Sequence, residues 1–299
     1  MRTPNRLWTF GVAAVMTASS AHFAGAQVRQ PYQVLDQEPD NVYIQPTAPI
    51  PSQMTNQGGV HFSFETQYLS TYMYRGVDQS TAPMVNESAL QFDGRLEFDL
   101  GKLPHPFIGV FSNIFNDDPV SRFEEVRPYA GLEWTVRPIT LATGFNGYIF
   151  PDREGVDTQE VWARISADDS RFWHTDRPFL SPYVYAAYDF DKYMGFYLEA
   201  GIQHDFVVGD SGLVVTVRGD FAYVAHDRYY FKAIRPTTDT GFQHYDVGVI
   251  VRYSLSRLLS IPQRFGEWQV KGLLYYSGPI DGEIRADSRV WGGVGLDFR

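Results

Sequence analysis

The stretch Leu90-Gln91-Phe92-Asp93-Gly94-Arg95-Leu96-Glu97-Phe98-Asp99-Leu100 alternates between an apolar and a polar series of residues over its whole length. Because successive side chains of a β-strand point to opposite faces, one face of this segment is apolar. The other face carries Gln91, Asp93, Arg95, Glu97 and Asp99. This alternation predicts a strand that separates an apolar medium from a polar one.

The same period of two recurs from Val60 almost to the end of the chain. It predicts about twelve strands, at residues 60–75, 88–100, 106–115, 124–136, 139–150, 158–167, 180–190, 195–206, 213–224, 241–255, 268–278 and 289–298. Pro128 and Pro182 fall inside two of them, where the missing N–H should interrupt the ladder and cause a bulge or a strand start.

The composition favours strands that face lipid. Aromatic residues make up 16% of the chain, with 19 Tyr and 22 Phe, yet the mean hydropathy is −0.26. Several of them, including Tyr72, Tyr74 and Phe115, fall near the ends of predicted strands and are expected in girdles at the lipid–water boundaries. Only helices and closed barrels satisfy all backbone groups in lipid. We therefore expect an all-β fold, a single-domain antiparallel transmembrane β-barrel of about 12 strands over residues 60–299. A secreted soluble β-protein, with the rings packed in a core, is the alternative.

The first residues predict export. Arg2 and Arg6 precede an apolar run, and Ala24-Gly25-Ala26 has the small-x-small pattern of a cleavage site, so residues 1–26 are expected to be a signal peptide. Residues 27–59 are rich in Pro, Gln, Asn and Asp and are expected to be a flexible periplasmic segment. The expected location is the bacterial outer membrane.

One motif resembles a known family. Tyr68-Leu69-Ser70-Thr71-Tyr72-Met73-Tyr74-Arg75-Gly76-Val77-Asp78-Gln79-Ser80 is similar to the opening strand of the TorF porin family, with an aromatic-x-Arg-Gly followed by a short Asp-Gln-rich loop. The resemblance implies an outer-membrane barrel and suggests a pore. The last apolar series ends at Phe298, one residue before the terminus, and looks like the final strand that the barrel-assembly machinery binds.

The charged faces of the strands are the candidate site. We expect a porin-like channel for passive diffusion of small polar solutes or ions, with a weak preference for cations because acidic residues are in surplus on these faces. The expected pore-lining residues are Arg95, Glu97, Arg127, Glu133, Arg164, Arg218, Asp220 and Arg252. The alternative is a non-conducting structural or adhesion barrel, whose charges pair and plug the lumen.

Catalysis, cofactors and resident metals are not expected. Gly-x-Ser-x-Gly and His-Glu-x-x-His motifs are missing. His226-Asp227 and His244-Asp246 could in principle hold a metal, but such residues are more often polar groups near loops. The expected partners are outer-membrane lipid, lipopolysaccharide and the solutes, whereas the net charge of −10 disfavours nucleic acid. Arg228–Lys232 mixes basic and aromatic residues that could contact sugar or lipopolysaccharide.

Overall fold

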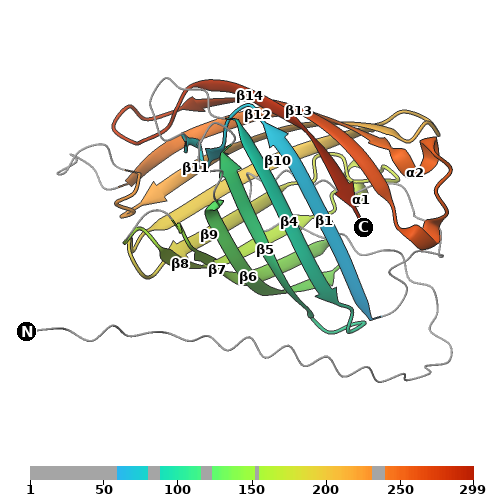
Figure 1. The fold of residues 1–299 in the computed structure, drawn as a ribbon, viewed down its shortest axis with the longest axis horizontal. Coiled ribbons are helices and arrows are strands. Elements are labelled where there is room, and N and C mark those ends of the chain that lie inside the picture. Colours follow the sequence, from blue (N-terminus) through green and yellow to red (C-terminus); the bar gives the residue numbers. More distant parts are fainter. Residues whose placement is uncertain (1–58, 80–87, 116–122, 152–154, 231–239) are drawn as a thin grey trace, which may run out of the picture.

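Twelve antiparallel strands, each paired with its neighbour in sequence order, close into a barrel in the computed structural model (Figure 1). The structure describes residues 59–79, 88–115, 123–151, 155–230 and 240–299. The barrel strands are β1 (Val60–Leu69), β4 (Ala89–Phe98), β5 (His105–Phe115), β6 (Phe123–Val136), β7 (Ile139–Tyr148), β8 (Thr158–Ala167), β9 (Tyr183–Asp189), β10 (Phe196–Val207), β11 (Leu213–Ala225), β12 (Thr240–Ser254), β13 (Trp268–Pro279) and β14 (Arg289–Phe298). The predicted fold class is confirmed.

The first and last strands close the cylinder. They pair antiparallel from Phe64 opposite Phe298 to Leu69 opposite Gly293. Closure leaves no unpaired edge in the sheet, so the backbone groups of the wall bond to one another. The signal peptide predicted over residues 1–26 and the segment predicted over 27–59, apart from Gly59, lie outside the described residues.

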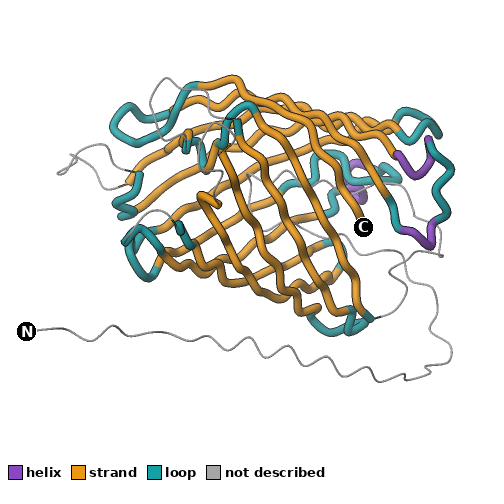
Figure 2. The backbone as a smooth tube through the Cα atoms, viewed as in Figure 1, coloured by secondary structure: helices purple, strands orange, loops and turns teal. Residues whose placement is uncertain are grey.

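The two ends of the barrel differ. Figure 2 shows the loops in teal at both ends of the orange strands, with the purple helices at one end only. We call the end where β1 begins and β14 finishes the terminus end, and the opposite end the loop end. The terminus end carries the short helices α1 (Ser170–Trp173), α2 (Leu255–Leu258) and η1 (Gln263–Phe265). Within the described ranges, no helix has the length and apolar character needed to cross a membrane.

Side chains alternate between an apolar outer face and a polar inner face. On β4, Leu96 is exposed whereas its neighbours Arg95 and Glu97 are buried. The outer face of the other strands is also apolar and exposed, for example at Ile108, Leu132, Val161, Val184, Leu198, Val217, Val249 and Leu274. In water such a belt would be unfavourable, so it requires an apolar surrounding.

The first strand ends earlier than the sequence pattern predicts, which corrects the predicted range of 60–75. After Leu69 the chain turns into a hairpin of β2 (Met73–Tyr74) and β3 (Val77–Asp78). Arg75 and Gly76 have positive φ angles of 48° and 70°, as a two-residue type I′ turn requires. Tyr72 and Tyr74, which the alternation placed near the lipid boundary, therefore belong to an inward-folded segment.

The two prolines act as their chemistry requires. Pro128 lies within β6, and the β6–β7 ladder is interrupted there, because pairing runs from Val136 to Tyr129 and resumes only at the bridge between Val126 and Ile149. Pro182 immediately precedes β9, so it marks the predicted strand start. Each proline thus stands where its missing N–H breaks or precedes a ladder.

Candidate functional site

The lumen contains clusters of ion pairs at different heights, and the first lies near the terminus end. Arg95 donates from Nη2 to Glu97 Oε2 at 2.8 Å and lies 3.5 Å from Glu133 Oε2. Its guanidinium carbon is 3.9 Å from the centre of the Phe107 ring. His105 Nδ1 is 3.4 Å from Glu97 Oε1. Polar and charged side chains from β4, β5 and β6 are therefore joined across the inner wall.

A second cluster lies at a similar height on the strands that close the barrel. Lys271 of β13 forms ion pairs with Glu65 of β1 and with Asp297 of β14, the latter at 3.1 Å. Arg252 lies 3.9 Å from Asp297. Only 2% of Lys271 is exposed, so this ammonium group depends on the two carboxylates.

A third cluster lies midway along β10 and β11. Arg218 Nε donates to Asp220 Oδ2 at 3.0 Å, and its Nη2 is 3.2 Å from Glu199 Oε1. Tyr183 lies beside them, with its hydroxyl 2.5 Å from both Arg218 Nη2 and Glu199 Oε1. Arg164 is placed over the Tyr183 ring at 4.3 Å.

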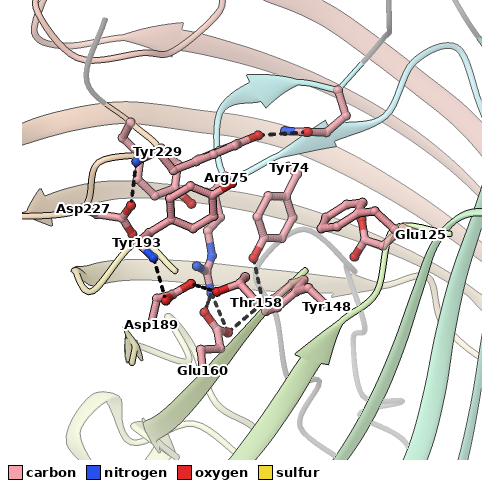
Figure 3. Close-up of a pocket in the computed structure, with 13 residues that line it drawn as sticks. Tyr74, Arg75, Glu125, Tyr148, Thr158, Glu160, Asp189, Tyr193, Asp227 and Tyr229 are labelled. Carbon is pink, nitrogen blue, oxygen red and sulfur yellow. Dashed lines mark hydrogen bonds and ion pairs between the residues drawn. The ribbon is translucent and has the colours of Figure 1, made fainter. Parts of the chain in front are cut away.

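The loop end differs because the β2–β3 hairpin enters the lumen. Arg75 at its tip donates from Nη2 to both carboxylate oxygens of Glu160, at 2.9 and 3.1 Å (Figure 3). The same Nη2 donates to the Tyr185 hydroxyl at 3.1 Å. Gln243 Nε2 donates to the Arg75 carbonyl at 2.7 Å. The tip is thus held from β8, β9 and β12 at once.

The two sides of the hairpin are also held. The Tyr72 hydroxyl accepts from Arg127 Nη2 at 2.9 Å, and the Tyr74 hydroxyl lies 2.8 Å from that of Tyr148. Asp78 forms an ion pair with Arg289. We call residues Ser70–Gln79 the lumen hairpin, since their contacts reach most of the way around the wall.

A polar and aromatic cavity lies beside the lumen hairpin. Its empty volume is about 480 Å³, open solvent included, and it is lined by Tyr74, Arg75, Gln79, Glu125, Tyr148, Phe150, Thr158, Glu160, Asp189, Tyr193, Asp227, Tyr229 and Tyr230. Burial raises the pKa of Asp227 to about 6 and that of Tyr193 to about 12. The Arg228–Lys232 motif is described up to Tyr230. Tyr229 and Tyr230 line the cavity, and residues 231 and 232 lie outside the described part.

All eight predicted pore-lining residues lie on inward-facing positions, but the structure does not gather them into one ring. Arg95, Glu97 and Glu133 form one cluster near the terminus end, and Arg218 with Asp220 forms another midway. Arg164 shares the Tyr183 ring with the Arg218 cluster. Arg252 lies in the Lys271 cluster, and Arg127 lies beside the lumen hairpin. Seven of the eight are buried, and only Arg164 is of intermediate exposure.

Sequence reasoning missed the inward role of several aromatic residues. Tyr72 and Phe115 were expected near the lipid boundary and are 4% and 2% exposed inside the barrel. Phe115 stands on the same face of β5 as Phe111, so the register of the inner face could have revealed it. For Tyr72, the one local signal was the Arg75-Gly76 pair, a sequence suited to a tight turn.

A closed barrel with an apolar outer belt and a charged interior defines the class: a transmembrane β-barrel of the outer-membrane type. No protein-family model and no curated protein matches the sequence. Among solved structures, the chain is similar to NanC porin, with 9% identity, 80% of this chain and 100% of that chain covered, and a TM-score of 0.44.

Two other solved structures are of the same kind. An outer-membrane channel from Pseudomonas putida F1 has 8% identity, with 88% of this chain and 99% of that chain covered and a TM-score of 0.46. Pseudomonas aeruginosa OpdK, solved with vanillate, has 12% identity, with 81% and 66% covered and a TM-score of 0.35.

Proposed function

We propose that this barrel is a narrow channel of the outer membrane for passive diffusion of ions and small polar solutes. The observation that carries the proposal is the continuity of charge along the lumen, from the Arg95 cluster at one end to the Arg75–Glu160 pair near the other. Fully buried ion pairs are often no more stable than apolar packing of the same volume. An interior that served only as filler would not need so many of them.

The channel is proposed to prefer cations weakly. Inward carboxylates outnumber inward basic groups: Glu65, Asp93, Glu97, Glu125, Glu133, Glu160, Glu199, Asp205, Asp220, Asp246 and Asp297 face Arg75, Arg95, Arg127, Arg164, Arg218, Arg252 and Lys271. Rings of one charge sign in a narrow lumen set ion selectivity. The eight pore-lining residues that the sequence predicts would orient and screen the solutes in this proposal. No covalent chemistry takes place.

The burial of these charges supports a second candidate, a non-conducting barrel that displays its loops to a partner. Seven of the eight predicted residues are buried, and the lumen hairpin occupies the loop-end half. The two candidates share the outer-membrane location, export by a signal peptide, assembly by the barrel-assembly machinery and contact with lipopolysaccharide. The TorF family assignment belongs to the first candidate.

Recording from refolded protein in planar bilayers separates the two. If the protein is a channel, the recording should show discrete current steps. Under a salt gradient, the sign of the reversal potential should be that of a cation-selective pore. The channel proposal would be contradicted if the protein is folded, as judged by its heat-modifiable mobility on gels, but gives no current at any voltage. Steps with an anion-selective reversal potential would keep the channel and overturn the proposed selectivity.

A further inference from the structure

Three potential metal ligands meet inside the barrel, on three adjacent strands. They are Glu199 of β10, Asp220 of β11 and His244 of β12, and one ligand atom from each lies within 4.8 Å of the others. All three side chains belong to the inner face, with 1%, 8% and 0% of the residue exposed. The pairing of β10 with β11 and of β11 with β12 brings them together, although they are far apart in sequence.

The hydrogen bonding of this group is incomplete. Neither ring nitrogen of His244 makes a hydrogen bond, and neither does Asp220 Oδ1. Asp246 Oδ2 lies 3.6 Å from His244 Nε2, beyond hydrogen-bonding distance. A buried imidazole without good hydrogen bonds is costly, so it indicates a missing neighbour.

The local charge favours a cation at this point. Glu199, Asp220 and Asp246 bring three carboxylates together, and the guanidinium of Arg218 compensates only one of them. With a neutral imidazole, the group is left with a negative surplus that a doubly charged ion would cancel. Two carboxylates and one imidazole are a donor set that suits Zn²⁺ and neighbouring divalent ions.

We propose that Glu199, Asp220 and His244 form a binding site for a divalent first-row transition-metal ion such as Zn²⁺, with a fourth position open to water. Tetrahedral Zn²⁺ places its ligand atoms about 3.4 Å apart, given bond lengths of about 2.1 Å. The three side chains would have to approach one another by about an ångström, which carboxylate rotation can provide.

The surroundings hold the ligands in place. The Tyr197 hydroxyl donates to Glu199 Oε2 at 2.7 Å, and the Tyr197 ring lies nearly parallel to the His244 imidazole at 6.4 Å. Gly76 of the lumen hairpin packs so closely on this imidazole that any side chain there would collide with it. Asp246 can accept the second N–H of His244, which is the usual partner of a metal-bound histidine.

The test is titration of the full chain, refolded in detergent and free of a polyhistidine tag, with Co²⁺ alone and then Zn²⁺. We expect a visible d–d absorption band that saturates at one Co²⁺ per chain and is abolished by one equivalent of Zn²⁺. H244Q and D220N should lose the band. D246N should weaken Co²⁺ binding by roughly 10–100-fold, as expected for a residue that orients a ligand.

The matched control is H105Q, which removes another buried lumen histidine that lies beside a carboxylate. It should bind Co²⁺ as the unmodified chain does. The proposal is overturned if the folded wild-type barrel gives no band, or if the band persists in both H244Q and D220N. Folding of every variant is checked by heat-modifiability. Because the readout is binding, it gives the same answer whether or not the barrel conducts.

Discussion

The two halves of the lumen are closed by different means. In the terminus-end half, Arg95 and Lys271 pair with carboxylates of the strands around them, so the wall fills its own interior. In the loop-end half, the guanidinium that meets Glu160 comes from Arg75, which belongs to an inserted segment. Glu160 of the wall, which also accepts hydrogen bonds from Asn146 and Tyr148 of the wall, is thus paired with a cation of the lumen hairpin.

Because of this difference, we expect substitutions in the terminus-end half to change stability and substitutions in the loop-end half to change permeation. Charges that pair within the wall cannot be removed without leaving a buried partner unpaired. The lumen hairpin makes no strand pair with the barrel, because its strands pair only with each other. Removing it should therefore change the space inside the barrel while the wall stays intact.

The largest effect is expected from replacing Thr71–Asp78 with a Gly-Ser linker. Loss of Tyr72, Tyr74 and Arg75 empties the loop-end half, so single-channel conductance in planar bilayers should rise several-fold. E283S, an exposed substitution at the same end of the barrel, is the control and should leave conductance unchanged. An unaltered conductance in a folded hairpin variant would show that the hairpin does not limit flow.

In the terminus-end half, the corresponding experiment acts on stability. K271M leaves Glu65 and Asp297 buried without their ammonium partner, so the free energy of unfolding should fall by about 3–5 kcal/mol. Adding E65Q and D297N to K271M should restore part of the lost free energy of unfolding. K102M, at an exposed lysine of the same end, should change it by less than about 0.5 kcal/mol. Equal effects of K271M and K102M in chemical denaturation would contradict the role of the cluster.

The strands of the wall and the inward face of the charged residues were predictable from sequence, but which side chains meet in the lumen was not. The alternation along Leu90–Leu100 reports which face each side chain takes, because strand geometry has a period of two. It does not report register, so the meeting of Arg95 with Glu133 across β4, β5 and β6 could not be derived. Tyr72 and Tyr74 continue the alternation of β1, which is why the hairpin was read as strand.

A smaller effect concerns pH at the loop end. Burial raises the pKa of Asp227 to about 6, above its value in an unfolded chain. The folded state therefore holds a proton that the unfolded state has released, and this stability is lost as pH rises from about 4 through 6. The loss is on the order of 3 kcal/mol for the Asp227–Tyr230 segment.

Hydrogen exchange at the Tyr229 and Tyr230 amides, corrected for the intrinsic exchange rate, should measure this pH-dependent loss of stability around Asp227. Exchange should be faster at pH 7.5 than at pH 5, and D227N should remove the difference because an amide does not titrate. A pH dependence that persists in D227N would assign the effect to another group.

The smallest effect has the opposite sign and lies at the terminus end. Burial would raise the pKa of Asp169, but its hydrogen bonds from the amides of Leu180 and Phe179, with those from Ser181 and Trp173, outweigh burial and lower the pKa. The stabilisation is therefore present above the unfolded pKa and is lost as pH falls through the folded value. Because Asp169 is partly exposed, the change should be slight. Exchange at the Leu180 amide should accelerate in acid, whereas exchange at Tyr229 slows there. If both ends responded to pH in the same direction, the contrast between a buried, weakly bonded carboxylate and a well-bonded one would be wrong.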